Sequence, residues 1–69
     1  MKPGTKIITT SKSLHFGQKG TIEEDYVGTY LIKADDETYD KAFTSTGREG
    51  KYFQVDARWC KEDIDAKDK

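Results

Sequence analysis

The sequence has little cysteine, little histidine and no long apolar run, and each shortage excludes a class of protein. Its 69 residues include one cysteine, Cys60, and one histidine, His15. A single cysteine cannot form an internal disulfide, whereas small secreted domains usually carry several. No apolar segment is long enough for a signal peptide or a membrane span. We therefore expect a cytoplasmic protein.

With one cysteine and one histidine, the chain has few side chains that could act in catalysis or hold a cofactor. His15 and Cys60 are the only candidate base and nucleophile, and nothing local in the sequence brings them together. A zinc site needs about four ligands, usually with Cys or His pairs, which this chain cannot supply. The acidic run 35–40 lacks the spacing and the central glycine of a calcium loop and is interpreted as a solvated turn. The chain is expected to be neither an enzyme nor a holder of a metal or cofactor.

Charge is abundant, and it is arranged in blocks that the net charge of −1 conceals. Residues 1–20 contain four lysines and no acid, whereas residues 21–40 contain seven acids and one lysine. Residues 41–61 contain five basic residues and two acids. Blocks that are separate in the fold would give the domain a basic and an acidic side. The alternative is the ordinary scatter of charge on a small soluble protein.

Short β-branched and aromatic segments between turn residues indicate an all-β fold. Strands are expected at residues 5–10, 20–25, 29–34, 38–43 and 51–56, followed by a helical turn and a last short strand. Five or six short strands in a domain of this size predict a small closed or nearly closed barrel. The expected core comprises Ile7, Ile22, Ile32, Phe53, Val55 and either Ala57 or Trp59.

The expected domain spans residues 1–61, and the charged segment 62–69 is expected to be a frayed, flexible tail. Within the domain, the strongest motif is Gly17-Gln18-Lys19-Gly20-Thr21-Ile22, which follows a β-branched run. Glycine tolerates positive φ and lets another backbone approach closely. Gly17 and Gly20 are therefore interpreted as structural residues of a basic loop that carries Lys19 at its tip.

This order of strand, basic loop, Gly-x-x-Gly-x-Ile and strand resembles the KOW motif of SH3-like barrels in ribosomal proteins and transcription elongation factors. The matching residues are Gly4, Ile7, Ile8, Gly17, Lys19, Gly20, Thr21 and Ile22. The resemblance implies a five-stranded barrel whose first loop contacts RNA or protein. The chain departs from the motif at Leu14-His15-Phe16 and in the acidic segment 23–25, which counts against RNA as the partner.

Protein binding is the function that the residues favour. The chain has more aromatic side chains than so small a core can bury, and aromatic and arginine residues dominate interface energetics. It would act as a non-enzymatic accessory or regulatory factor on a larger intracellular complex, or as a phage-encoded protein that redirects a host enzyme. The predicted partner-binding residues are Lys12, Phe16, Lys19, Tyr30, Tyr52, Arg58 and Trp59.

The alternative function is a KOW-like nucleic-acid-binding barrel of the transcription or translation apparatus. Its lysines would follow phosphates while exposed aromatic rings stack on bases. The sequence pI of about 5.7 is well below that of a dedicated nucleic-acid domain. Any such binding is therefore expected to be weak and sensitive to salt.

Overall fold

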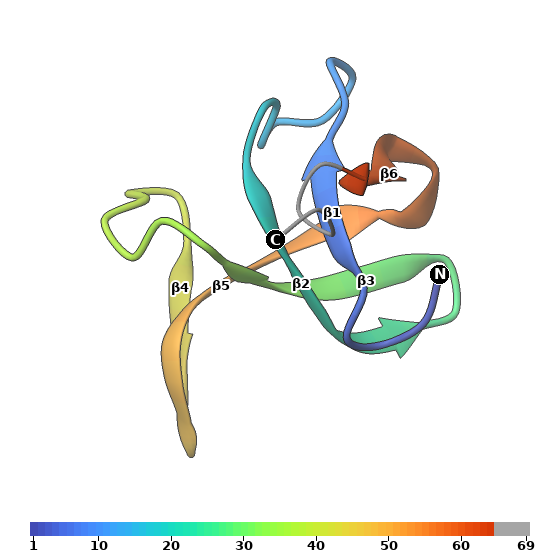
Figure 1. Ribbon diagram of the computed structural model, residues 1–69. Helices are drawn as coiled ribbons and strands as arrows, with labels where there is room; N and C mark the ends of the chain where they lie inside the picture. Colours follow the sequence, from blue (N-terminus) through green and yellow to red (C-terminus); the bar gives the residue numbers. More distant parts are fainter. Residues whose placement is uncertain (65–69) are drawn as a thin grey trace.

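The computed structural model describes residues 1–64, in which six strands form one antiparallel sheet (Figure 1). A 3-10 turn, η1 (Ala57–Trp59), separates the last two strands. No helix in this part of the chain is long and apolar enough to cross a membrane. The predicted all-β class is confirmed. The strands are β1 (Lys6–Thr9), β2 (Lys19–Tyr26), β3 (Thr29–Ala34), β4 (Phe43–Ser45), β5 (Arg48–Asp56) and β6 (Cys60–Glu62).

The strand order β4-β5-β3-β2-β1-β6 places β5 and β6 far apart in the sheet, although only η1 joins them. So short a connection requires the sheet to curl until β1 and β6 return toward the end of β5. The backbone N–H of Ala57 donates to Gly28 O at 3.0 Å, and that of Thr10 donates to Trp59 O at 2.8 Å. These two hydrogen bonds fix η1 in place. We call the junction where η1 links β5 to β6 the seam.

The curled sheet is not a closed barrel, so of the two expected forms, closed or nearly closed, the closed form is wrong. Within the described residues, β4 and β6 are the two edges, and no ladder of hydrogen bonds joins them. The covalent link through η1 brings the two sides of the sheet together instead. Regular structure continues past residue 61, the expected end of the domain. β6 reaches Glu62, and the Asp63 N–H donates to Lys6 O at 2.9 Å. Residues 65–69 of the expected tail lie outside the described residues.

The core occupies one face of the sheet, and the alternation of side chains along β3 and β5 predicted most of it. Ile7, Ile22, Ile32, Phe53 and Val55 are all buried, as expected. Ala57 and Trp59 are both half-buried and pack against this cluster from η1. Three residues that the expected core lacked complete it: Tyr30, Ala34 and Cys60.

The fourth strand is displaced from its expected position at 38–43, because a turn occupies the start of that segment. The backbone N–H and the hydroxyl of Thr38 both donate to the Asp36 carboxylate, at 2.9 and 2.6 Å. The Tyr39 N–H donates to Asp36 O at 3.1 Å. A side chain that captures nearby backbone donors in this way competes with strand pairing. β4 therefore begins only at Phe43.

A bulge in β2 brings two consecutive acids to the outer face of the sheet, opposite the core. Pairing with β3 shifts register between Ile22 and Glu24, so Glu23 is the extra residue. Both carboxylates approach the Arg48 guanidinium at the start of β5, Glu23 at 4.0 Å and Glu24 closer. The bulge and this ion-pair cluster therefore tie β2 to the hairpin of β4 and β5.

Candidate functional site

The loop between β1 and β2, residues 10–18, carries a dense set of internal hydrogen bonds. The Ser13 N–H donates to Thr10 O and the Phe16 N–H donates to Ser13 O, both at 3.1 Å. Gly17 adopts φ +83°, the left-handed conformation expected of it, and its N–H donates to Thr9 O at 3.2 Å. A loop held in this way needs little further ordering when it binds a partner.

Thr9 anchors the loop from beneath. Its side chain lies in the core, with an exposed fraction of 2%. The Thr9 hydroxyl accepts a hydrogen bond from the Gln18 N–H at 3.0 Å and donates to His15 O. The buried hydroxyl therefore satisfies backbone groups from two separate positions of the loop.

His15 attaches the loop to β5 and to the segment between β3 and β4. Its ring packs at 4.6 Å, centroid to centroid, against Phe53, and Nδ1 lies 2.6 Å from the Tyr39 hydroxyl. Burial, reinforced by the positive charge of Lys41, lowers the pKa of His15 below its ordinary 6.5. The pKa of Tyr39 is raised by burial and by Asp40, so the phenol stays protonated and can donate to the neutral imidazole. His15 is thus a structural residue of the loop.

This packing predicts a pH-dependent stability. The unfolded chain takes up a proton at His15 near pH 6.5, whereas the folded chain resists it, so stability falls as the pH drops below 6.5. The depressed pKa values of Asp36 and Asp56 place their titration below this window. We expect urea unfolding to show a smaller free energy at pH 5.5 than at pH 7.5. In a His15→Gln variant most of that difference should vanish; an unchanged pH profile would contradict the assignment.

The same loop exposes two large apolar side chains. Leu14 is 85% exposed and Phe16 is 65% exposed, although the backbone around them is well hydrogen-bonded. Isolated exposed apolar residues are common, but two on one short, ordered loop form a concentration that favours an interaction site. Leu14 was not among the predicted contact residues. In the sequence, Leu14 could have been recognised by its position two residues before Phe16 in an otherwise polar segment.

Trp59 of η1 lies beside the loop and forms a wall of two adjoining pockets. One pocket is lined by Thr10, Ser11, Lys12, Arg58 and Trp59. The other is lined by Ser13, Leu14, His15, Gln54, Val55, Asp56 and Trp59. Loop and seam meet here because Thr10 donates its N–H to the carbonyl of Trp59. Phe16 lines neither pocket but is exposed on the same loop, and we call Lys12, Leu14, Phe16, Arg58 and Trp59 together the loop–η1 surface.

Arg58 is fixed in place on this surface by Asp56. The Asp56 carboxylate accepts from the Arg58 backbone N–H at 2.9 Å, from Nε at 3.2 Å and from Nη2 at 3.0 Å. This pairing lowers the pKa of Asp56. The Arg58 side chain nevertheless remains 81% exposed, so its guanidinium can still be reached by a partner.

The structure brings together part of the predicted site. Lys12, Arg58 and Trp59 line one pocket, and Phe16 lies on the same loop. Lys19 lies elsewhere, because it begins β2 instead of capping the loop, and its Nζ is 3.9 Å from the Asp63 carboxylate. Its expected position at the loop tip was therefore wrong.

Tyr30 and Tyr52 were expected to lie on an aromatic contact surface, but both are buried. Tyr30 belongs to the core cluster, and its hydroxyl accepts a hydrogen bond from the N-terminal amine at 2.8 Å. Tyr52 faces the outer side of β5, but the Arg48 guanidinium covers it, 5.9 Å above the ring centroid. The Tyr52 hydroxyl donates to Glu49 O at 3.0 Å. Neither ring offers a partner an open surface.

Gly20 was assigned both to the expected strand 20–25 and to the basic loop, and the structure places it in the strand. It lies inside β2, in register with Ile7 and Ala34, and its φ is not positive. A Cβ at this position would stand 2.5 Å from Lys33 O and would also collide with Ile32 Cγ2. Gly20 is therefore a site of close approach between strands and not a loop residue.

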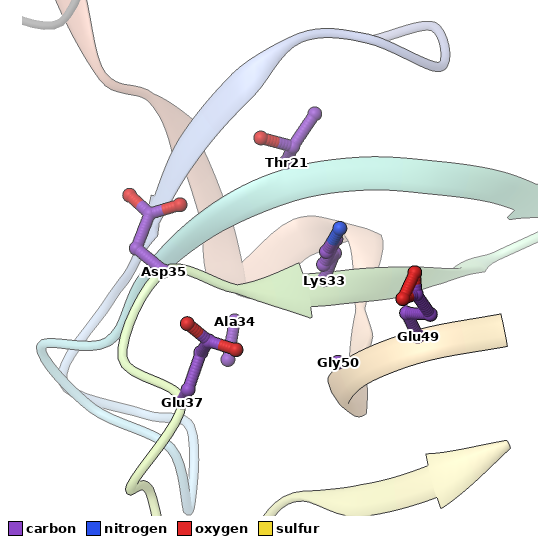
Figure 2. Close-up of a pocket in the computed structure, with 7 residues that line it drawn as sticks. All are labelled: Thr21, Lys33, Ala34, Asp35, Glu37, Glu49 and Gly50. Atoms are coloured by element: carbon purple, nitrogen blue, oxygen red, sulfur yellow. The ribbon is translucent and has the colours of Figure 1, made fainter.

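A hollow on the outer face carries the acidic side chains (Figure 2). Asp35 and Glu37 follow β3, while Glu49 lies on β5 across from Lys33. Lys6 forms an ion pair with Asp35 at 2.8 Å. Within residues 1–64, no group of three or more acidic, His or Cys side chains is arranged to hold a metal ion.

His15 and Cys60, the candidate catalytic pair, have separate environments. The His15 ring contacts Tyr39 and Phe53, whereas Cys60 lies in the core and its thiol faces Asp56 O at 3.8 Å. Burial, together with Asp56, raises the pKa of Cys60 to about 11. A thiol with this pKa is protonated at neutral pH and is a poor nucleophile.

Comparison with protein-family models, curated proteins and solved structures finds no match to this chain.

Proposed function

We propose that this protein is a non-enzymatic protein-interaction module that binds its partner through the loop–η1 surface. The observation that carries the proposal is the exposure of Leu14 and Phe16 on a loop fixed by Thr9, His15 and the seam. A preorganised surface with apolar side chains loses little entropy on binding, so most of its burial contributes to affinity. Trp59 and Arg58 add residue types that are enriched in binding hot spots.

The proposal includes an SH3-like, KOW-like ancestry for the fold and a cytoplasmic setting. The antiparallel order, the short η1 before the last strand and the first loop with its glycine support the ancestry. The single buried cysteine supports a reducing compartment. The protonated thiol of Cys60 and the structural engagement of His15 support a role without catalysis. We place the protein as an accessory factor on a larger complex.

Capture from lysate with the tagged protein tests this function, with and without nuclease and at two salt concentrations. The double variant Leu14→Ser, Phe16→Ser should reduce capture by at least about tenfold, because it removes two exposed apolar anchors. Val27→Ser is the matched control, since Val27 is fully exposed on the turn between β2 and β3. Its capture should equal that of the parent.

Two outcomes would contradict the proposal. Capture that survives the double variant would move the site away from the loop–η1 surface. Recovery that depends on nucleic acid and collapses with added salt would establish the alternative function, binding to phosphates.

A further inference from the structure

The two pockets on either side of Trp59 differ in chemistry. Lys12 and Arg58 supply positive charge to one pocket, together with the hydroxyl-bearing Thr10 and Ser11. Leu14 and Val55 supply apolar surface to the other. Because Trp59 lines both pockets, ligand groups that fill them must be close neighbours in the partner. The two pockets therefore favour a partner in which a group that suits the basic pocket lies next to an apolar group.

The first pocket has side chains that can donate hydrogen bonds to a negatively charged oxygen atom of a ligand. Among residues 1–64, Lys12 takes part in no ion pair, so its charge is available to a ligand. Asp56 occupies Nε and Nη2 of Arg58, and a guanidinium has further N–H donors on its other nitrogen. Lysine and arginine donors form their strongest hydrogen bonds with ionised acceptors such as carboxylates.

The second pocket favours an apolar side chain. Leu14 is almost fully exposed at its rim, and covering it would remove apolar surface from water. Asp56 also lines this pocket, but Arg58 engages both oxygens of its carboxylate. The paired carboxylate therefore repels an acidic ligand less than a free one would.

We propose that the loop–η1 surface binds a protein segment in which an acidic residue stands beside a large apolar residue. The carboxylate contacts Lys12 and Arg58, and the apolar side chain packs between Leu14 and Trp59. This inference rests on the proposed function and specifies the chemistry of the partner. The charge of the first pocket selects an acidic segment over a basic one.

Selection from a displayed library of random dodecapeptides tests the inference, with the full chain as bait and the Leu14→Ser protein for counter-selection. Both Leu14 and Lys12 are exposed, so variants at these positions keep the fold. Enriched peptides should carry Asp or Glu next to, or one residue away from, a large apolar residue. For these peptides, Lys12→Glu should raise Kd by at least about tenfold. Lys33→Glu is the matched control, because Lys33 lines the hollow of Figure 2, and it should leave Kd unchanged.

Enrichment of basic or uncharged peptides, or no enrichment beyond the counter-selection, would overturn the inference. So would equal affinity of the parent and the Lys12→Glu protein. These results are distinguishable from failure of the proposed function. If capture from lysate still depends on Leu14 and Phe16 while the peptides show no acidic preference, the surface is a binding site and only the chemistry assigned to its partner is wrong.

Discussion

Replacing Gly20 with alanine is expected to destabilise the fold by about 1 to 3 kcal/mol, although it adds only a methyl group. Gly20 is the buried second residue of β2, where the strand passes close to β3. The new Cβ would stand 2.5 Å from the carbonyl oxygen of Lys33, a backbone atom that cannot rotate away. Relief requires β2 and β3 to separate, which loosens the ladder at the centre of the sheet.

Thermal and urea unfolding measure this effect, and in a domain of this size the melting temperature should fall by on the order of 10 °C. Asparagine substitutions separate the two possible roles of a glycine. Gly17 has positive φ and open space around it, so Gly17→Asn should be tolerated well, because Asn visits this conformation. Gly20→Asn should be no better than Gly20→Ala. A stable Gly20→Asn protein would show that backbone conformation, and not close approach, explains this glycine.

Replacing Thr9 with valine is expected to cost about 1 kcal/mol and to loosen the loop, at almost constant side-chain volume. The hydroxyl is buried and serves both the Gln18 N–H and the His15 carbonyl. Valine removes this side-chain partner and leaves the Gln18 N–H and the His15 carbonyl with only the hydrogen bond between them, at 3.0 Å. The loop that carries Leu14 and Phe16 then loses its internal anchor.

Thr9→Ser is the matched control, because it keeps the hydroxyl and loses only a methyl group. We expect hydrogen exchange of the Gln18 amide to accelerate in the valine variant and to change much less in the serine variant. Partner capture should fall with valine even at temperatures where the protein remains folded. Equal exchange at Gln18 in the two variants would contradict the anchoring role of the hydroxyl.

The sequence predicted the alternation of the strands and therefore most of the core. Ile32 and Phe53 are recognisable because every second residue of a half-buried strand faces the core. The curvature of the sheet leaves no such periodic pattern in the sequence. The burial of Tyr52 depends on Arg48 of its own strand, which covers the ring, and on its register neighbours Lys33 and Phe43, so the alternation along β5 alone does not predict it.

The positions of the predicted contact residues could be anticipated from the sequence only in part. Lys12, Arg58 and Trp59 were predicted from residue type, and the seam brings them together. Lys19 and Gly20 were assigned to the loop because their motif is compatible with a turn, yet β2 begins at Lys19. Whether a glycine serves conformation or close approach depends on neighbouring strands that are distant in sequence. A single sequence without its fold does not supply that information.

The seam has a consequence for when the protein can work during its synthesis. β1 pairs with β6, with Ile7 opposite Glu62, so this contact joins segments that are far apart in the sequence. Contacts of such long sequence separation form late and slow folding. The loop–η1 surface needs both the loop after β1 and Trp59 just before β6. A chain emerging from the ribosome therefore cannot complete the proposed binding surface before β6 has left the exit tunnel.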